Sequence, residues 1–302
     1  MQNSDRLKSS ASTQVIWKIA DAIIFIVLTL AAFACFYPFY YIFIYSLSDS
    51  NLASRGVFLY PVGLTLNNYR EILVQNDVLQ GALVSVSRTV LGSGLTVLCS
   101  AMFAYLLAQP KLPGRKFFYR LIITSMYVNS GLIPWFVVMN LYGLQNNFLL
   151  YIIPSAVAVF YVILCKTYIE SLPVELTEAA YIDGAGPVYI FTKIVFPLSR
   201  PVLATIVIFS AVDQWNTWMD NFYLINDPKL QTLQLTLLNY LTNQQVLASM
   251  SIASRLTKAN YVTSPTSVRM AISLLVAAPI LLVYPIFQKH FVKGILIGAV
   301  KG

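Results

Sequence analysis

Six long apolar segments, separated by polar connections, constrain this chain more than any other feature. They lie near residues 19–47, 82–108, 118–141, 148–169, 199–224 and 268–290. A helix needs about 20 apolar residues to cross a hydrocarbon core of about 30 Å. Only 11% of the residues are charged, against about 25% in soluble proteins. The sequence therefore predicts an all-α integral membrane protein with six transmembrane helices in a single domain, residues 1–302.

Prolines and glycines interrupt several of these segments. Gly92 and Gly94 lie in the second segment, Gly131 and Pro134 in the third, and Pro154 in the fourth. Such breaks are tolerated in lipid where neighbouring helices or a water-filled cavity satisfy the freed backbone groups. The pattern favours a bundle with a path through it over a simple membrane anchor.

The basic residues predict the orientation of the chain. Its net charge is +8, and most Lys and Arg residues fall on one side of the membrane if the N-terminus is cytoplasmic. The connection KLPGRKFFYR, between the second and third segments, is the clearest example. We expect both termini in the cytoplasm, with residues 1–18 and 291–302 as cytoplasmic segments. This distribution explains the basic balance, so no nucleic-acid partner is implied.

A possible signal-peptidase site occurs inside the first apolar segment. Ala32-Phe33-Ala34 follows a basic N-terminal region and resembles an A-x-A cleavage site. The apolar run continues past it to Tyr45, however, and cleavage would leave five spans. We expect the segment to remain as the first span.

Residues 171–201 form a polar, helix-prone island with the sequence SLPVELTEAAYIDGAGPVYIFTKIVFPLSRP. Pro173 suits the first turn of a helix, and Glu175 lies near its positive end. Gly184 follows Asp183 and can adopt the left-handed conformation that ends a helix. A second short helix is expected from Pro187 to about residue 195. The island is predicted to be a helix, a glycine turn and a helix, held in water beside the membrane.

This island resembles the EAA loop of ABC importer permeases. The matching pattern is EAA at 178–180, DGA at 183–185, and then Phe191, Ile194, Pro197 and Pro201. In that family the loop, here residues 171–198 between the fourth and fifth spans, is a coupling helix that docks in a cleft of the cytoplasmic ATPase. The resemblance implies a type I ABC importer fold. It assigns ATPase coupling to Glu178, Ala179, Ala180, Asp183, Gly184 and Ala185.

Further segments resemble carbohydrate importers of the maltose-transporter type. These are PWF at 134–136, the Trp215-Asn216 pair and the ending FQKHFVKGILIGAVKG. The resemblance implies an oligosaccharide permease of the bacterial cytoplasmic membrane, working with a second homologous permease, an ABC ATPase dimer and an extracytoplasmic solute-binding protein. It also implies a C-terminal tail that reaches the ATPase through Lys293, Gly294 and Lys301; a disordered tail is the alternative.

No catalytic or metal-binding pattern is present. The chain lacks G-x-x-x-x-G-K-[ST], H-E-x-x-H and G-x-S-x-G, which mark phosphate-binding loops, zinc proteases and serine hydrolases. Cys35, Cys99 and Cys165 are isolated within apolar segments. We therefore expect a transport subunit and not an enzyme. The chain itself is expected to bind no cofactor, with ATP and Mg on the partner ATPase.

Polar residues in the fifth span are candidates for the substrate pathway. Buried polar groups in a bilayer are costly and usually pair or line a cavity. Trp215 and Trp218 are three residues apart and are expected on one helix face, where rings could stack on a sugar. Alternatively, Trp218 lies in an interfacial belt and Asn216 joins two helices. The candidate pathway residues are Asp213, Gln214, Trp215, Asn216, Trp218 and Arg88.

Arg88 and Arg269 lie near the outer ends of the second and sixth spans. They are expected to extend to headgroups or to pair with Asp213 or Asp220. If they line the pathway instead, acidic oligosaccharides of the uronate type become plausible substrates. Another polar solute, and a stand-alone secondary transporter, remain alternatives. The outer connections 48–81 and 225–267 either meet the binding protein, as in the family, or are solvated linkers.

Overall fold

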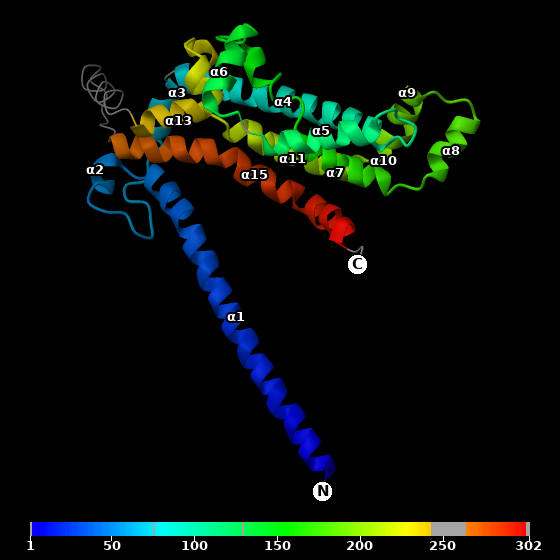
Figure 1. Cartoon of the computed structure of the whole chain (residues 1–302). Helices are drawn as coiled ribbons and strands as arrows, with labels where there is room; N and C mark the ends of the chain where they lie inside the picture. Colours follow the sequence, from blue (N-terminus) through cyan, green and yellow to red (C-terminus); the bar gives the residue numbers. More distant parts are fainter. Residues whose placement is uncertain (1, 75, 129, 243–263, 300–302) are drawn as a thin grey trace. The chain divides into compact units, whose positions relative to one another are not determined.

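The computed structural model of the chain describes residues 2–74, 76–128, 130–242 and 264–299 (Figure 1). These residues form helices and turns and contain no β-strand. They divide into two compact units. The first holds residues 2–72 and 264–275, and the second holds residues 73–242 and 276–299.

The first unit is built on the long helix α1, Gln2–Ser46. The helix includes the polar residues 2–18, so it begins well before the apolar run. Its segment Trp17–Ser46 is long and apolar enough to cross a membrane, and no side chain of its most apolar window is buried. Lipid or another protein must therefore cover this helix.

A compact turn closes the C-terminal end of α1. It contains α2, Ser50–Ala53, and α3, Asn67–Val74. The buried Asn68 side chain donates to the carbonyl oxygens of Ser46 and Ser48, at 2.8 and 3.0 Å. Its own oxygen accepts from Ser50 Oγ at 3.0 Å. These bonds explain why the segment at 65–69 folds back onto the end of α1.

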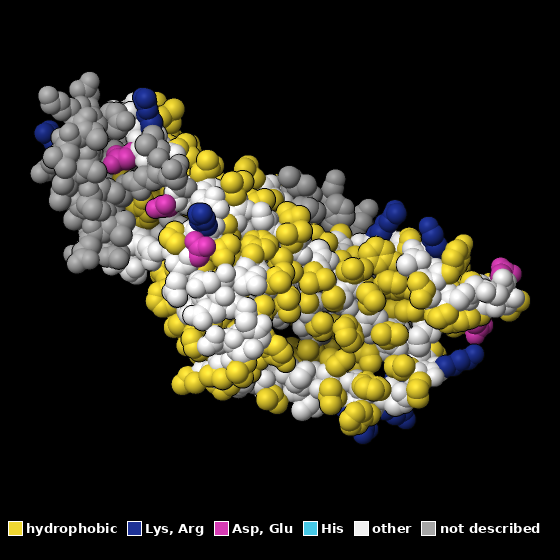
Figure 2. All heavy atoms as spheres, turned by 90° about the horizontal axis from the view of Figure 1, so that it is seen from above, with side chains coloured by type: hydrophobic (Ala, Val, Ile, Leu, Met, Phe, Trp, Pro, Cys, Tyr) yellow, Lys and Arg dark blue, Asp and Glu magenta, His cyan; other side chains and the backbone are white. Residues whose placement is uncertain are grey.

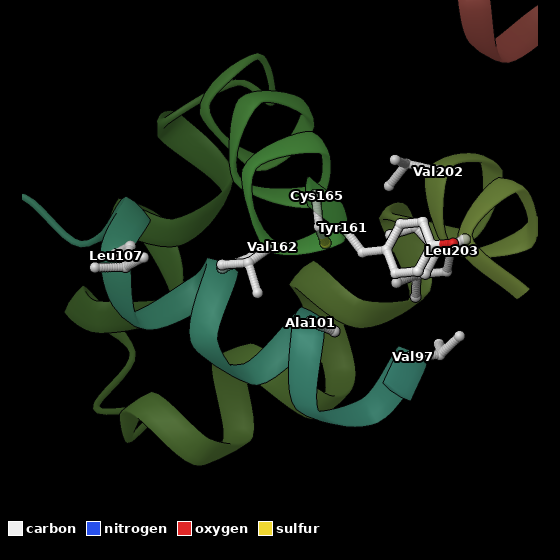
Figure 3. Close-up of a cluster of buried hydrophobic side chains, with 10 residues drawn as sticks. Val97, Ala101, Leu107, Tyr161, Val162, Cys165, Val202 and Leu203 are labelled. Carbon is white, nitrogen blue, oxygen red and sulfur yellow. The ribbon is translucent and has the colours of Figure 1, made fainter. Parts of the chain in front are cut away.

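Helix α4, Asn76–Ala108, is the centre of the second unit. Helices α7, Val159–Glu170, and α11, Arg200–Asn216, pack along it (Figure 1). Figure 3 shows the apolar cluster at their meeting point. Its members are Val97, Ala101, Ala104, Leu107, Tyr161, Val162, Cys165, Val202, Leu203 and Ile206. Cys165 is thus a core residue.

Three of the predicted spans are broken. The third consists of α5, Arg115–Tyr127, and α6, Leu132–Leu141, which meet at an angle of 118°. The fourth consists of η1, Phe148–Tyr151, followed by α7. The fifth ends at Asn216, and α12, Met219–Leu224, follows after a two-residue gap. A helix break inside the membrane leaves backbone N–H and C=O groups without helical partners. Because the hydrocarbon core holds no water, these groups must face protein or a water-filled cavity.

The polar island also differs in detail from the prediction. Helix α8 covers Glu175–Ile182, so Pro173 precedes it. Helix α9, Pro187–Ile190, continues through a π-helical turn, η2, Phe191–Val195, into α10, Phe196–Leu198. This helical stretch meets α11 at 78°. The second helix is therefore longer than predicted and reaches the residue before Ser199.

The remaining helices are η3, Pro228–Leu230, α13, Leu233–Thr242, and α15, Pro265–Ala299. The part of the predicted outer connection at 243–263 lies outside the described residues. Helix α15 continues past residue 290, where the sequence suggested that the last helix ends and a flexible tail begins.

The described helices suit a membrane. Three are long and apolar enough to cross on their own, and up to five spans result if each bent pair is counted as one. The fourth predicted segment is divided between η1 and α7, with 4 and 12 residues. Neither piece alone reaches the length of about 20 residues that a spanning helix needs. Figure 2 shows many hydrophobic side chains, interspersed with other side chains and backbone, on one face, as expected for contact with lipid.

Candidate functional site

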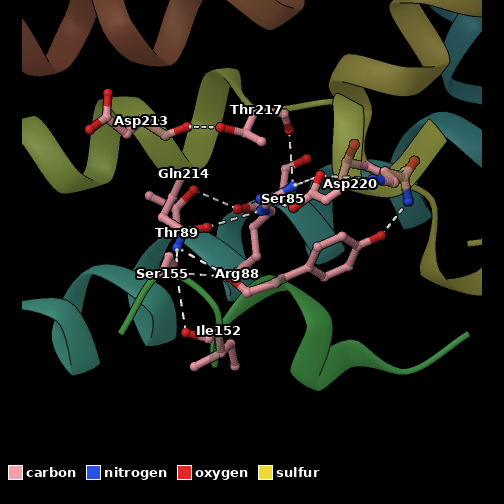
Figure 4. A network of polar contacts seen from close by, with 12 residues as sticks. Ser85, Arg88, Thr89, Ile152, Ser155, Asp213, Gln214, Thr217 and Asp220 are labelled. Atoms are coloured by element: carbon pink, nitrogen blue, oxygen red, sulfur yellow. Dashed lines mark hydrogen bonds and ion pairs between the residues drawn. The ribbon is translucent and has the colours of Figure 1, made fainter. Parts of the chain in front are cut away.

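A buried ion pair lies at the centre of a polar network in the second unit (Figure 4). Arg88 of α4 donates to both carboxylate oxygens of Asp220 in α12, at 2.7 and 3.3 Å. It also donates to the Thr217 carbonyl oxygen at 3.0 Å and to Gln214 Oε1 at 3.2 Å. Its guanidinium lies 4.4 Å from the centre of the Tyr151 ring. The Arg88 and Asp220 side chains are only 3% and 11% exposed, so the prediction that Arg88 pairs with an aspartate is confirmed.

The Arg88 interactions explain the break between α11 and α12. The Thr217 carbonyl lies at the C-terminal end of α11, where the last carbonyls of a helix lack partners. Arg88 supplies a donor to this carbonyl and simultaneously holds Asp220 in the first turn of α12. One side chain therefore fixes both helix ends.

Gln214 connects this pair to the fourth predicted span. Its amide nitrogen donates to the Tyr151 carbonyl oxygen at 3.1 Å and to Ser155 Oγ at 2.6 Å. Thr96 of α4 donates to the Ser155 carbonyl oxygen at 2.8 Å. Gln214 fits against α4 only because residue 92 is glycine: a Cβ there would lie 2.5 Å from its amide nitrogen.

Tyr151 is held from several sides. Its hydroxyl donates to the Leu230 carbonyl oxygen at 2.7 Å and accepts from the Asn221 amide. Asn221 is fully buried. The ring of Tyr151 thus forms a fixed wall beside Arg88.

A cavity of about 720 Å³ opens beside this network. Asp213 faces it and accepts a hydrogen bond from the Tyr161 hydroxyl at 2.5 Å. The lining combines aromatic rings with hydroxyl and charged groups, and its main members are Arg88, Thr96, Ser130, Trp135, Tyr151, Ser155, Tyr161, Ser210, Asp213, Gln214, Thr217 and Asp220. Pockets of this size and mixed character are typical of small-molecule sites.

The candidate pathway residues separate into two groups. Arg88, Asp213 and Gln214 line the cavity, whereas Trp215, Asn216 and Trp218 are not part of its lining. Trp215 is buried, and its indole nitrogen donates to the Val276 carbonyl oxygen of α15 at 3.0 Å. Asn216 accepts from Gln234 at 3.2 Å. Both join helices of the bundle, which is the alternative raised for Asn216.

The expectation that Trp215 and Trp218 share a helix face is wrong. Helix α11 ends at Asn216, and Trp218 immediately precedes α12. The Trp218 ring instead packs edge-on against Phe222, with 5.8 Å between the ring centres. The break has no proline or glycine to mark it in the sequence.

The sequence did not identify several lining residues, among them Trp135, Tyr151, Ser155 and Tyr161. Trp135 lies in the PWF segment and Ser155 follows Pro154, so both were close to noted features. Tyr151 and Tyr161 occur in apolar segments among many other tyrosines. Nothing in their local sequence separates them from packing residues.

The predicted coupling loop, residues 171–198, has the turn expected for it. Gly184 has a φ of +81°. The N–H groups of Gly184 and Ala185 donate to the carbonyl oxygens of Tyr181 and Ala180, at 3.1 and 2.9 Å. This pair of bonds is a Schellman motif, which satisfies the last carbonyls of α8. The left-handed glycine therefore sets the direction in which the chain leaves α8.

One side of the loop rests on the bundle, and the other is open. Tyr105 of α4 donates to the Pro187 carbonyl oxygen at 3.1 Å, and its ring packs against Phe191. Ala180 and Ala185 pack against the same cluster. No residue of α8 is buried. Among the coupling candidates, Glu178, Ala179, Asp183 and Gly184 are exposed.

The predicted tail residues are only partly described. Lys293 and Gly294 lie within the backbone of α15, whereas Lys301 lies outside the described residues. Their proposed contact with an ATPase stays a prediction.

Comparisons with known proteins identify the family. The sequence profile described as "Binding-protein-dependent transport system inner membrane component" matches residues 97–297. The polygalacturonan/rhamnogalacturonan transport system permease protein YtcP of Bacillus subtilis (strain 168) is 34% identical over 94% of this chain and 99% of its own length. Protein LplC of the same organism is 35% identical over 88% of this chain and 89% of its own length.

A solved structure agrees with this result. It is a bacterial ABC transporter involved in the import of the acidic polysaccharide alginate. One of its chains is 30% identical to this one, with a TM-score of 0.86 over 91% of this chain and 97% of that chain. The all-α membrane fold expected from the EAA resemblance is therefore confirmed. The chain belongs to the family of binding-protein-dependent transport system inner membrane components, the permease subunits of ABC importers.

Proposed function

We propose that this chain is a permease subunit of an ATP-driven importer for oligosaccharides. It forms part of the translocation pathway with a second homologous permease and receives cargo from an extracytoplasmic solute-binding protein. An ABC ATPase dimer with bound ATP and Mg drives it from the cytoplasm, where both termini lie. The observation that carries the proposal is the exposed loop around α8, which rests on α4 and presents unburied groups outside the apolar spans.

The exposed groups of this loop suit a protein partner. Ile182 is 86% exposed and Val188 is 74% exposed, and burial of such apolar surface is favourable by about 25 cal/mol per Å². Glu178 and Asp183 are exposed beside them and would meet donors in the ATPase cleft. Ala179 leaves room for the partner backbone. Lys293, Gly294 and Lys301 are proposed as further ATPase contacts.

The cavity suits a sugar. Trp135 and Tyr161 offer ring faces, on which the C–H groups of a sugar can stack. Ser155, Ser210 and the Asp213 carboxylate offer hydrogen bonds to its hydroxyls. The cavity lies in the same compact unit as the coupling loop.

Gly184→Val tests the coupling role. Valine is strained by about 1–2 kcal/mol in the left-handed conformation, which destabilises the Schellman turn, and we expect α8 to shift from its position. Gly186→Val is the matched control, because Gly186 has a φ of −73° and open space around its Cβ position. We expect the Gly184 variant to reach the membrane but to lose transport-coupled ATP hydrolysis, and the control to retain it.

The assay is a detergent pull-down of the tagged chain followed by ATP hydrolysis with binding protein and cargo. Recovery of an ATPase and a second permease with the wild-type chain supports the proposal. Normal uptake by Gly184→Val would refute the lever role of the loop. A chain that purifies alone and transports without ATP would refute the importer proposal itself.

A second candidate is an acidic oligosaccharide of the uronate type. Two similar proteins favour it, a polygalacturonan/rhamnogalacturonan permease and an importer of the acidic polysaccharide alginate. The cavity in this subunit adds a condition: Arg88 is paired with Asp220, and Asp213 is a second carboxylate. Positive charge for the cargo must then come from the second permease or the binding protein.

Competition between cargo types tests this candidate. Uptake of a labelled galacturonate oligomer would be measured in the presence of an excess of a neutral oligosaccharide of the same length. Uptake that the neutral sugar does not reduce supports the acidic class. Uptake of the neutral sugar without uptake of the galacturonate oligomer would refute the acidic candidate, but it would still support an oligosaccharide importer.

A further inference from the structure

A second cavity, of about 850 Å³, lies where α5 begins. Its lining includes the basic residues Arg115, Lys116, Arg120 and Lys166, and none of its lining residues is acidic. The described substrate cavity and the coupling turn share none of these side chains. Four basic side chains around one cavity favour the binding of an anion there.

The charge at the cavity is only partly compensated. Glu170, the last residue of α7, receives hydrogen bonds from both Lys166, at 2.8 Å, and Arg115. One carboxylate therefore serves two cations. Lys116 and Arg120 are exposed and lie one helical turn apart on α5, so their charges face the same direction.

The position of these cations indicates the membrane boundary. Glu170 directly precedes the coupling loop, and Arg115 begins the apolar helix α5. Phe117 and Leu121 of α5 are 64% and 54% exposed, as expected for side chains in lipid. The cations thus lie at the level of the headgroups, on the side of the coupling loop. Basic pockets in this location can bind anionic lipid headgroups.

We propose that this cavity binds the headgroup of an anionic phospholipid. Lys116 and Arg120 contact its phosphate, with Arg115 and Lys166 behind them. The exposed apolar side chains of the same helix, Phe117 among them, contact its acyl chains. This site does not depend on the transported cargo, and it ties the lipid to the end of α7 from which the coupling loop leaves.

The test uses native mass spectrometry to measure how tightly three probes bind to the full-length chain in detergent. The probes are phosphatidylglycerol, phosphatidylcholine with the same acyl chains, and inorganic phosphate. The variant is Lys116→Gln with Arg120→Gln. The matched control is Lys193→Gln with Arg200→Gln, which removes two exposed basic residues that do not line the cavity, one inside the coupling loop and one just after it.

We expect phosphatidylglycerol to bind the wild-type chain and the control more tightly than phosphatidylcholine does. In the Lys116/Arg120 variant its affinity should fall about thirtyfold, the equivalent of about 2 kcal/mol for two basic residues near a membrane surface. Unchanged affinity in that variant would overturn the proposal. Displacement of the lipid by an equal concentration of phosphate would overturn the lipid assignment. Loss of the ATPase from the pull-down, with lipid binding intact, would assign these cations to the ATPase instead.

Discussion

The contact between Gly92 and Gln214 gives a sharp test of the polar network. A Cβ at residue 92 would lie 2.5 Å from the Gln214 amide nitrogen and 2.7 Å from its amide carbon. Gly92→Ala must therefore displace the Gln214 side chain from the space against α4. Gly94 lies two residues further along the same helix and has no neighbouring atom within 4 Å of its Cβ position. Gly94→Ala is thus a control with the same chemical change.

The magnitude follows from the bonds that Gln214 would lose. It donates to the Tyr151 carbonyl and to Ser155, and it accepts from Arg88. Two neutral hydrogen bonds contribute about 1 kcal/mol each, and one to a charged group about 2 kcal/mol. Alanine returns about 1 kcal/mol by its higher helix propensity. We expect Gly92→Ala to lower the free energy of unfolding by about 3 kcal/mol, and Gly94→Ala to raise it by about 1 kcal/mol.

The assay is unfolding of the purified chain in mixed micelles with increasing SDS, followed by circular dichroism and tryptophan fluorescence. Gly94→Ala controls for helix propensity and expression. Equal unfolding midpoints for the two variants would refute the role of Gly92 as the residue that admits Gln214. If Gly92→Ala lowers the free energy of unfolding by the same amount in a Gln214→Ala background, the strain lies elsewhere.

Three further predictions concern the same unit. Arg88→Met should lower the free energy of unfolding by about 3–5 kcal/mol, because it leaves Asp220 buried and charged. Adding Asp220→Leu should restore most of this loss, as measured by the unfolding midpoints of the single and double variants. Tyr161→Phe removes only the hydroxyl that binds Asp213, so oligosaccharide uptake should fall while the unfolding midpoint changes little; normal uptake would show that Asp213 needs no such partner. Tyr105→Phe removes the bond to the coupling loop and should lower transport per ATP hydrolysed in proteoliposomes, with the recovered complex unchanged; an unchanged ratio would contradict it.

The sequence predicted features that depend on local chemistry. The Asp183-Gly184 pair placed a left-handed turn correctly, because few other residue pairs favour that conformation. The cost of a lone charge in lipid left two expectations for Arg88, extension to the headgroups or pairing with Asp213 or Asp220, and the structure shows the pair with Asp220.

Features that depend on distant partners could not be predicted. The helix break after Asn216 has no glycine or proline, and it depends on Arg88, which lies far away in the sequence. For the same reason the sequence could not show that Trp215 binds a carbonyl of α15 while Tyr151 and Tyr161 face the cavity. Apolar segments supply many aromatic residues, and only packing decides which of them face an open space.

Helix α4 joins the two functional regions of the second unit. Arg88, in the first half of the helix, fixes the junction of α11 and α12 beside the cavity, and Tyr105, near the C-terminal end, holds the Pro187 carbonyl of the predicted coupling loop. At 1.5 Å per residue these two side chains are separated by about 25 Å along a single helix. The cluster around Ala101 and Val162 binds α4 to α7 and α11 between them. We therefore expect a displacement of the loop to shift α4 as a unit, and the cavity wall that contains Arg88 with it, because a packed helix transmits a shift more readily than an irregular segment such as 183–187.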